Sequence, residues 1–143
     1  DMILLDALRK KPAMPLTELK NPHKSADTGA YSDGIVVDGW LYVSGQGPIS
    51  VKTGKAVAGT IEDEVRLTLE NVGDVLRAGN CTYADVVRCT CYLANIEDFD
   101  RFNAVYQEFF GGVRPTRTTV QAVLGLGIKV EIDAIARIPS TTS

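Results

Sequence analysis

Apolar and polar positions repeat with clear periods from residue 31 onward. Short apolar runs at 33–37 and 40–44 flank Asp38-Gly39, a dipeptide suited to the positive φ angles of a type I′ turn. These two runs predict a β-hairpin. After Thr60, apolar residues recur at intervals of three and four, which predicts an amphipathic α-helix. The apolar stripe of this helix comprises Ile61, Val65, Leu69, Val72 and Leu76.

Both ends of this first helix have capping signals. Thr60 can cap the N-terminus through its hydroxyl group. Asp63 and Glu64 place negative charge in the first turn, where the helix dipole favours it. We expect Gly79 to end the helix as a left-handed C-cap.

Residues 85–93 alternate in the manner of a β-strand. The alternation assigns to one face Val87, Cys89, Cys91 and Leu93, and to the other Arg88, Thr90 and Tyr92. A second helix is predicted from the capping residue Asn95 to a stop at Gly111-Gly112. The inner stripe of this helix comprises Phe99, Phe102, Tyr106 and Phe109.

Two final strands are predicted at 115–121 and 129–138, so the elements run ββ-α-β-α-ββ. This order indicates an α+β domain, in which one mixed sheet carries two helices packed on one face to bury their stripes. We assign residues 17–143 to this single domain and 1–16 to an N-terminal extension. A short amphipathic helix is compatible with residues 2–8, before prolines at 12, 15 and 22 interrupt any continuous element.

The sheet face away from the helices is predicted to be unusual. In the last strand, alternation places Glu131 and Ile135 on this open face. In the strand before it, we assign Arg117, Thr119 and Gln121 to the same open face. Trp40, Tyr42 and Tyr92 are expected beside them. Such a surface is too polar for a core and too aromatic for plain solvent, so we expect an interface that contains a site.

Composition excludes several classes of protein. The chain has 143 residues, of which 45% are hydrophobic, which suffices for one core. A net charge of -3 provides no basic field for nucleic acid. No apolar run approaches the roughly 20 residues that a membrane helix needs. We therefore expect a soluble domain with no nucleic-acid or membrane partner, although a targeting segment removed before Asp1 stays open.

The cysteines indicate neither a disulfide framework nor a metal site. Three cysteines are an odd number in a short chain, which favours a reducing, cytoplasmic location. Cys89 and Cys91 share the predicted buried face, where a thiol behaves as a small hydrophobe. His23 is distant from both in sequence, so no metal ligand set is expected. The short Gly125–Gly127 segment, GLG, lacks the setting of a dinucleotide fingerprint and is predicted to be a turn.

Six separated motifs resemble one known family. They are GAYSDGI, LYVSGQGPI, TLENVGDVLRAG, FNAVYQEFF, RPTRTTVQ and VEIDAIA, in the order and spacing of the Rid/YjgF imine and enamine deaminases. The resemblance covers residues 17–138. It implies a chorismate-mutase-like fold, a homotrimer with sites between subunits, and hydrolysis of small 2-imino or 2-enamino acids without a cofactor.

The resemblance also implies site residues, carried over by position. The family's binding arginine falls on Arg117 and its acidic residue on Glu131. A guanidinium grips a carboxylate through two parallel hydrogen bonds, and a carboxylic side chain can orient water and move protons. The family's site tyrosine falls on Tyr31, which is expected to take part in catalysis as a lid. The family's Ser-Gly pair falls on Ser44 and Gly45, which are expected to provide a polar binding site. Two further binding positions fall on Asn103 and Thr119.

Each of these residues also has a structural interpretation. Arg117 can form an interface salt bridge, and Glu131 can be the partner of such a bridge. Tyr31 can be simple packing, and Asn103 can satisfy nearby backbone groups. Retention of both Arg117 and Glu131 favours catalysis, because a carboxylate binder needs only the first.

The chain departs from the family pattern around the proposed site. Thr119 stands where many members have Cys, Ala30 replaces a Pro, and Asp33 replaces a Gln. The family's RLPK-type loop is replaced by LGLG at 124–127. Substrate choice therefore stays open between small imino acids and a larger aminomuconate-type product. A non-catalytic binding or regulatory module is the alternative, and a ribonuclease or translation-inhibitor role fits the acidic charge less well.

Overall fold

The computed structural model describes residues 1–4, 15–26 and 29–140. The strands are β1 (Thr17–Leu19), β2 (Gly34–Val37), β3 (Trp40–Gln46), β4 (Val86–Leu93), β5 (Thr116–Gln121) and β6 (Val130–Arg137). The long helices are α2 (Ile61–Ala78) and α3 (Phe99–Phe109). In the described residues the strands form a single sheet in the order β1-β2-β3-β6-β4-β5, in which only β4 and β5 run parallel.

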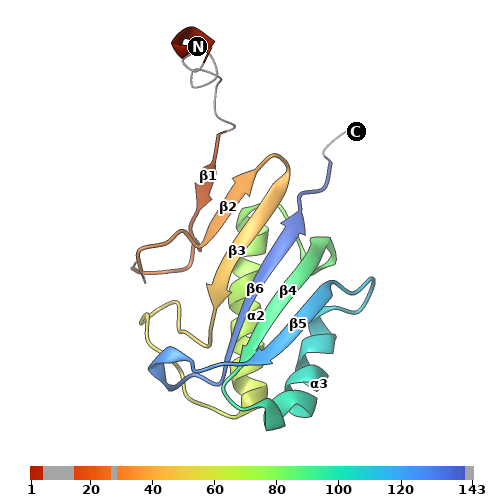
Figure 1. Cartoon of the computed structure of the whole chain (residues 1–143). Coiled ribbons are helices and arrows are strands. Elements are labelled where there is room, and N and C mark those ends of the chain that lie inside the picture. The colour runs from red at the N-terminus through yellow and green to blue at the C-terminus, as the bar shows by residue number, and fades with distance from the viewer. Residues whose placement is uncertain (5–14, 27–28, 141–143) are drawn as a thin grey trace.

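Helices α2 and α3 both cover one face of the sheet, and the other face is open (Figure 1). The α+β architecture predicted from the element order is therefore confirmed. The core lies between the helices and the sheet, where the α2 stripe packs on the inner side chains of β3, β4 and β6. Its largest fully buried side chains include Phe102, Leu41, Ile61, Leu69, Leu76, Leu93 and Ile132.

Local signals placed the hairpin and the start of α2 correctly. Asp38 and Gly39 have φ angles of 53° and 80°, as a type I′ turn requires. Thr60 caps α2, and its hydroxyl oxygen accepts a hydrogen bond from the backbone N–H of Asp63. The prediction of a left-handed Gly79 was wrong, because Gly79 has φ -97° and the left-handed residue is Asn80 at φ 61°. Asparagine tolerates this region, so the turn moves one residue along the chain.

The face assignment in β4 was wrong at its first position. Val86 is buried, whereas Val87 is 40% exposed. The cause is a register shift between Val86 and Arg88 against β6, since a bulge reverses the alternation on one side of it. From Cys89 onward the predicted alternation is confirmed, and Cys89, Cys91 and Leu93 are fully buried.

The face assignment in β5 was wrong throughout. Arg117 pairs with Cys89 and Thr119 pairs with Cys91, so both side chains point toward the helices. Thr118 lies on the open face instead, where its hydroxyl accepts a hydrogen bond from Nη2 of Arg88 (2.9 Å). Alternation could not reveal which face carries Arg117, because neither face of the TRTTVQ strand has a series of apolar residues.

Two N-terminal features bear on the prediction. The sequence pattern did not reveal β1, a short edge strand that pairs antiparallel with β2. Residues 5–8 of the predicted N-terminal helix lie outside the described residues, and residues 2–4 are helical. None of the helices in the described part of the chain is both long enough and apolar enough to cross a membrane.

Candidate functional site

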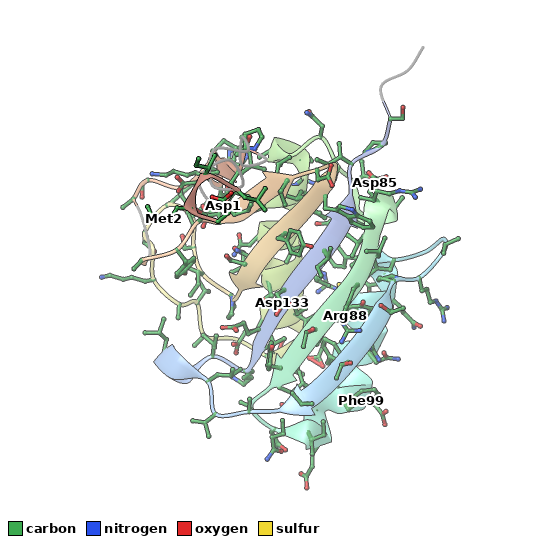
Figure 2. All side chains as sticks on the ribbon, turned by 45° about the horizontal axis from the view of Figure 1, so that its top comes forward. Asp1, Met2, Asp85, Arg88, Phe99 and Asp133 are labelled. Carbon is green, nitrogen blue, oxygen red and sulfur yellow. The ribbon has the colours of Figure 1, made fainter. Side chains whose placement is uncertain are left out.

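The predicted site residues form two groups on opposite faces of the sheet. We call Arg117, Asn103 and Thr119 the arginine half-site, which lies between β5 and α3. We call Glu131, Gly45, Ser44 and Tyr31 the carboxylate half-site, which lies at the open face around the end of β3. Figure 2 shows the two sides of the sheet: Asp133 and Arg88 project from the open face of β6 and β4, whereas Phe99 lies with α3 behind the sheet.

In the arginine half-site, aromatic rings and an amide hold the guanidinium of Arg117. Its carbon Cζ lies 4.7 Å from the ring centroid of Tyr106, 5.3 Å from that of Phe102 and 5.5 Å from that of Phe99. Nη1 donates a hydrogen bond to Oδ1 of Asn103 (2.8 Å). Arg117 has no carboxylate partner among the described residues of its own chain. An interface salt bridge with a neighbouring copy stays a prediction.

Two buried hydroxyl groups beside Arg117 have unused hydrogen-bonding capacity. Oγ1 of Thr119 and the phenol oxygen of Tyr106 have no regular hydrogen-bond partner among the described residues. The phenol interacts with the Cys89 thiol, which is a weak partner at best. A cavity of about 360 Å³ opens at Arg117 and is also lined by Asn103, Tyr106, Gln107, Phe110, Arg114 and Pro115. The rings restrict the motion of the guanidinium while it remains able to bind an anion from this side.

In the carboxylate half-site, Glu131 lies directly against the backbone of Gly45. A Cβ atom added at position 45 would be 2.8 Å from Oε2 of Glu131, so a side chain there would displace the carboxylate from this position. The pairing of β3 with β6 shifts register between Val43 and Gln46, and this irregularity brings Gly45 to the carboxylate. Irregular pairing of this kind often re-aims side chains next to active sites.

The segment that carries Tyr31 is tied to β3 by short hydrogen bonds. The Ser44 hydroxyl donates to the carbonyl oxygen of Ser32 (2.5 Å), and the Ser44 N–H donates to that of Asp33 (2.9 Å). The buried carboxylate of Asp33 in turn accepts from the N–H of Asn21 (2.7 Å) and from Nζ of Lys24 (2.6 Å). Asp33, noted above only as a departure from the family, therefore anchors the segment that presents Tyr31.

Burial and a neighbouring charge both act on Glu131. Partial burial raises the pKa of the Glu131 carboxyl above its usual range, and the negative charge of Asp133 raises it further. A raised pKa lies closer to neutral pH, where a carboxyl group can both accept and return a proton. This shift is a reason to consider Glu131 chemically active.

No thiol or metal chemistry is indicated in the described residues. Cys81, Cys89 and Cys91 are free and buried. Burial raises the pKa of Cys89 to about 11, so this thiol stays protonated at neutral pH. No group of three or more His, Cys, Asp or Glu side chains in the described part of the chain could hold a metal ion.

Residues 22–138 match the family described as endoribonuclease L-PSP. The chain belongs to this family. A 2-iminobutanoate/2-iminopropanoate deaminase of Rattus norvegicus is 40% identical over 112 residues, which is 78% of this chain and 82% of the rat protein. A Lactococcus lactis protein that carries the name of a regulator, AldR, is 38% identical over 117 residues, 80% of this chain and 92% of its own. The family resemblance of the sequence motifs is thereby confirmed.

Solved structures of the L-PSP family share the fold. Yeast YEO7 superposes with a TM-score of 0.83 at 32% identity, over 87% of this chain and 100% of that one. Escherichia coli TdcF, crystallised with bound serine, gives a TM-score of 0.78 at 31% identity, over 85% and 98% of the two chains.

The sequence did not indicate two residues that lie near the site. Tyr106, predicted only as part of a helix stripe, supplies the ring closest to Arg117. Leu126, in the loop where the chain departs from the family, lines a cavity with Tyr31 and Gly45. The unusual LGLG sequence was the only signal that could have drawn attention to Leu126.

Proposed function

We propose that this protein hydrolyses reactive 2-imino or 2-enamino acids to 2-oxo acids and ammonia. The observation that carries the proposal is the Glu131 carboxyl, whose pKa is raised and which lies against Gly45 at an irregularity of the sheet. Two facts about relatives support it: several are named 2-iminobutanoate/2-iminopropanoate deaminases, and TdcF binds serine, an amino acid with a carboxylate.

The residues of the two half-sites suit each step of this hydrolysis. Arg117 binds the substrate carboxylate through paired hydrogen bonds and so fixes the plane of the imine. Glu131 accepts a proton as water attacks C2 of the protonated imine, which gives a 2-amino-2-hydroxy carboxylate whose amino group is uncharged. Glu131 then returns this proton to the amino group, the C–N bond breaks, and ammonia leaves. The hydroxyl group becomes the 2-oxo group as its proton passes to solvent or ammonia, so one water is consumed.

The two half-sites require two copies of the chain. Arg117 and Glu131 lie on opposite faces of one sheet, with β4 between their strands, so a small substrate cannot touch both in one copy. We propose that the open face packs against a neighbouring copy in a homotrimer, which brings the arginine half-site of one copy to the carboxylate half-site of another. Exposed aromatic side chains on that face, Trp40 and Tyr42, support such packing.

The pH dependence of the reaction should follow Glu131. Activity is expected to rise as the carboxyl ionises, so the acidic limb of kcat/KM should lie above the range of an ordinary glutamate. Asp133 raises the Glu131 pKa through like charge, so Asp133→Asn should lower that pKa and move the limb to lower pH. The limb should still lie above the usual range, because burial remains. A pH–rate profile of both proteins checks this, and an unmoved limb would assign the titration to another group.

A binding or regulatory role without catalysis is the second candidate. The name of the Lactococcus lactis relative supports it, and the same carboxylate-binding cavity would serve. An aminomuconate-type substrate remains a variant of the first proposal.

The deciding experiment measures ammonia release. An amino-acid oxidase generates 2-imino acids in situ, and this protein is added in catalytic amount. We expect ammonia to appear faster than in the spontaneous reaction by at least an order of magnitude, as general acid–base catalysis commonly provides. Saturable binding of 2-oxo acids without any acceleration would instead favour the regulatory role.

A further inference from the structure

A second cavity adjoins the carboxylate half-site. It has a volume of about 120 Å³. Tyr31, Gly45 and the turn after β3 form its walls, and Leu126 forms part of its rim. Apolar side chains in its lining come from Leu126, Ile49, Val51 and Ala26, and polar ones from Lys24, Gln46, Ser50 and Asn71.

Leu126 is held at this rim in an unfavourable backbone conformation. Its φ and ψ angles are 61° and 13°, in the left-handed region that leucine rarely adopts. The side chain is also 79% exposed, so burial in the described part of the chain does not repay this strain. Glycine would fit the same backbone at no steric cost, as it does at Gly127 (φ 69°). Backbone strain that is retained in this way clusters at functional sites.

The supports on both sides of the cavity restrict its shape. On the loop side, the buried Glu64 accepts hydrogen bonds from the backbone N–H (2.9 Å) and from Nζ (2.8 Å) of Lys129. On the other side, Nδ2 of the buried Asn71 donates to the carbonyl oxygens of Gly47 and Ile49, both at 2.9 Å. Leu126 therefore faces a cavity wall that is itself anchored.

The chemistry of the lining selects among substrate side chains. Nζ of Lys24, which also lines the cavity, lies 2.6 Å from the Asp33 carboxylate, so its charge is already compensated. The volume is somewhat smaller than the roughly 150 Å³ of an apolar cavity that admits benzene. The amide groups of Gln46 and Asn71 in the lining already donate to backbone carbonyl oxygens. The cavity thus suits a short or branched aliphatic group better than an aromatic ring or a second carboxylate.

We propose that Leu126 determines specificity by closing this cavity over the aliphatic side chain of a 2-imino acid. The inference rests on the proposed function, and it adds a substrate class. In the shared site, Arg117 of one copy holds the carboxylate and Glu131 of another copy faces C2. The remaining substituent on C2 then enters the cavity beside Gly45. Imines of branched-chain amino acids are then better substrates than those of phenylalanine or glutamate.

The test compares 2-imino acids derived from leucine, alanine, phenylalanine and glutamate. The wild type should show its highest kcat/KM with the leucine-derived imine. In Leu126→Gly, which removes the side chain and relaxes the backbone, the ratio of leucine-derived to alanine-derived kcat/KM should fall about tenfold, since lost apolar contact in a pocket costs 10-fold or more. Val123→Gly, at an exposed apolar position outside this cavity, is the matched control and should keep the wild-type ratio.

The possible outcomes separate the two proposals. Equal losses for every imine in Leu126→Gly, or an altered oligomer mass, would make Leu126 a structural or interface residue and overturn the inference. An unchanged ratio in a fully active Leu126→Gly variant would also overturn it. Failure of the wild type to accelerate any imine would instead overturn the proposed function, and this inference with it.

Discussion

Replacing Arg117 with Met is expected to reduce ammonia release from 2-imino acids to nearly the spontaneous rate while the protein still folds. A substrate carboxylate that loses its bidentate partner in a partly desolvated site should lose on the order of 2–5 kcal/mol of binding free energy. Methionine keeps an apolar stem against the rings of Phe102 and Tyr106, so it limits the packing loss that Ala would cause. Arg117→Lys should recover little activity, because an ammonium does not fix the plane of the imine.

Because Arg117 lies beneath α3, its replacement also affects stability, so the stability of the variant must be measured. The lost cation–π contacts should lower the free energy of unfolding by about 0.5–2 kcal/mol. Denaturant unfolding of Arg117→Met therefore accompanies the assay. Arg66→Ala removes an exposed arginine whose partner is Glu108 on the neighbouring helix, and it should leave activity unchanged. Wild-type turnover in Arg117→Met would refute the role of the guanidinium.

Glu131→Gln should lower kcat by about 10²–10⁴-fold, the usual contribution of a positioned acid or base. The amide keeps the shape that fits against Gly45, but it cannot accept and return a proton. Substrate binding through Arg117 should survive, so KM should change much less than kcat. Steady-state kinetics separates the two parameters. Glu70→Gln, on the exposed surface of α2, is the matched control. A change in KM alone would reduce Glu131 to a binding role.

Arg117→Met and Glu131→Gln together test whether the half-sites come from different copies. Each is expected to be inactive alone. Co-expressed in equal amounts, they are expected to form mixed trimers in which about one quarter of the clefts combine an intact Arg117 with an intact Glu131. Activity should return to roughly that fraction of wild type, with a sedimentation mass three times 15.4 kDa. No recovery in verified mixed oligomers would contradict a site shared between copies.

Local patterns in the sequence were sufficient for much of the fold. The Asp38-Gly39 turn, the capping residue Thr60 and the α2 stripe depend on neighbours within a few residues, and the structure has them as predicted. In α3, Phe102 and Tyr106 are buried as predicted, whereas Phe99 and Phe109 are only partly buried. The identities of the site residues came from motifs resembling the family. Motifs carry residue types, but they do not state which side chains meet.

Only the tertiary structure decided the arrangement of the site. Both faces of β5 are polar, so the direction of Arg117 depends on its register with the buried Cys89 of β4, a partner 28 positions earlier in the chain. The contact of Glu131 with Gly45 likewise depends on pairing between β6 and β3. Strand register is set by long-range burial, because a shift of one residue exchanges the faces. The sequence by itself determined the local elements and the chemistry available, and the packing of the sheet determined that this chemistry is divided between its two faces.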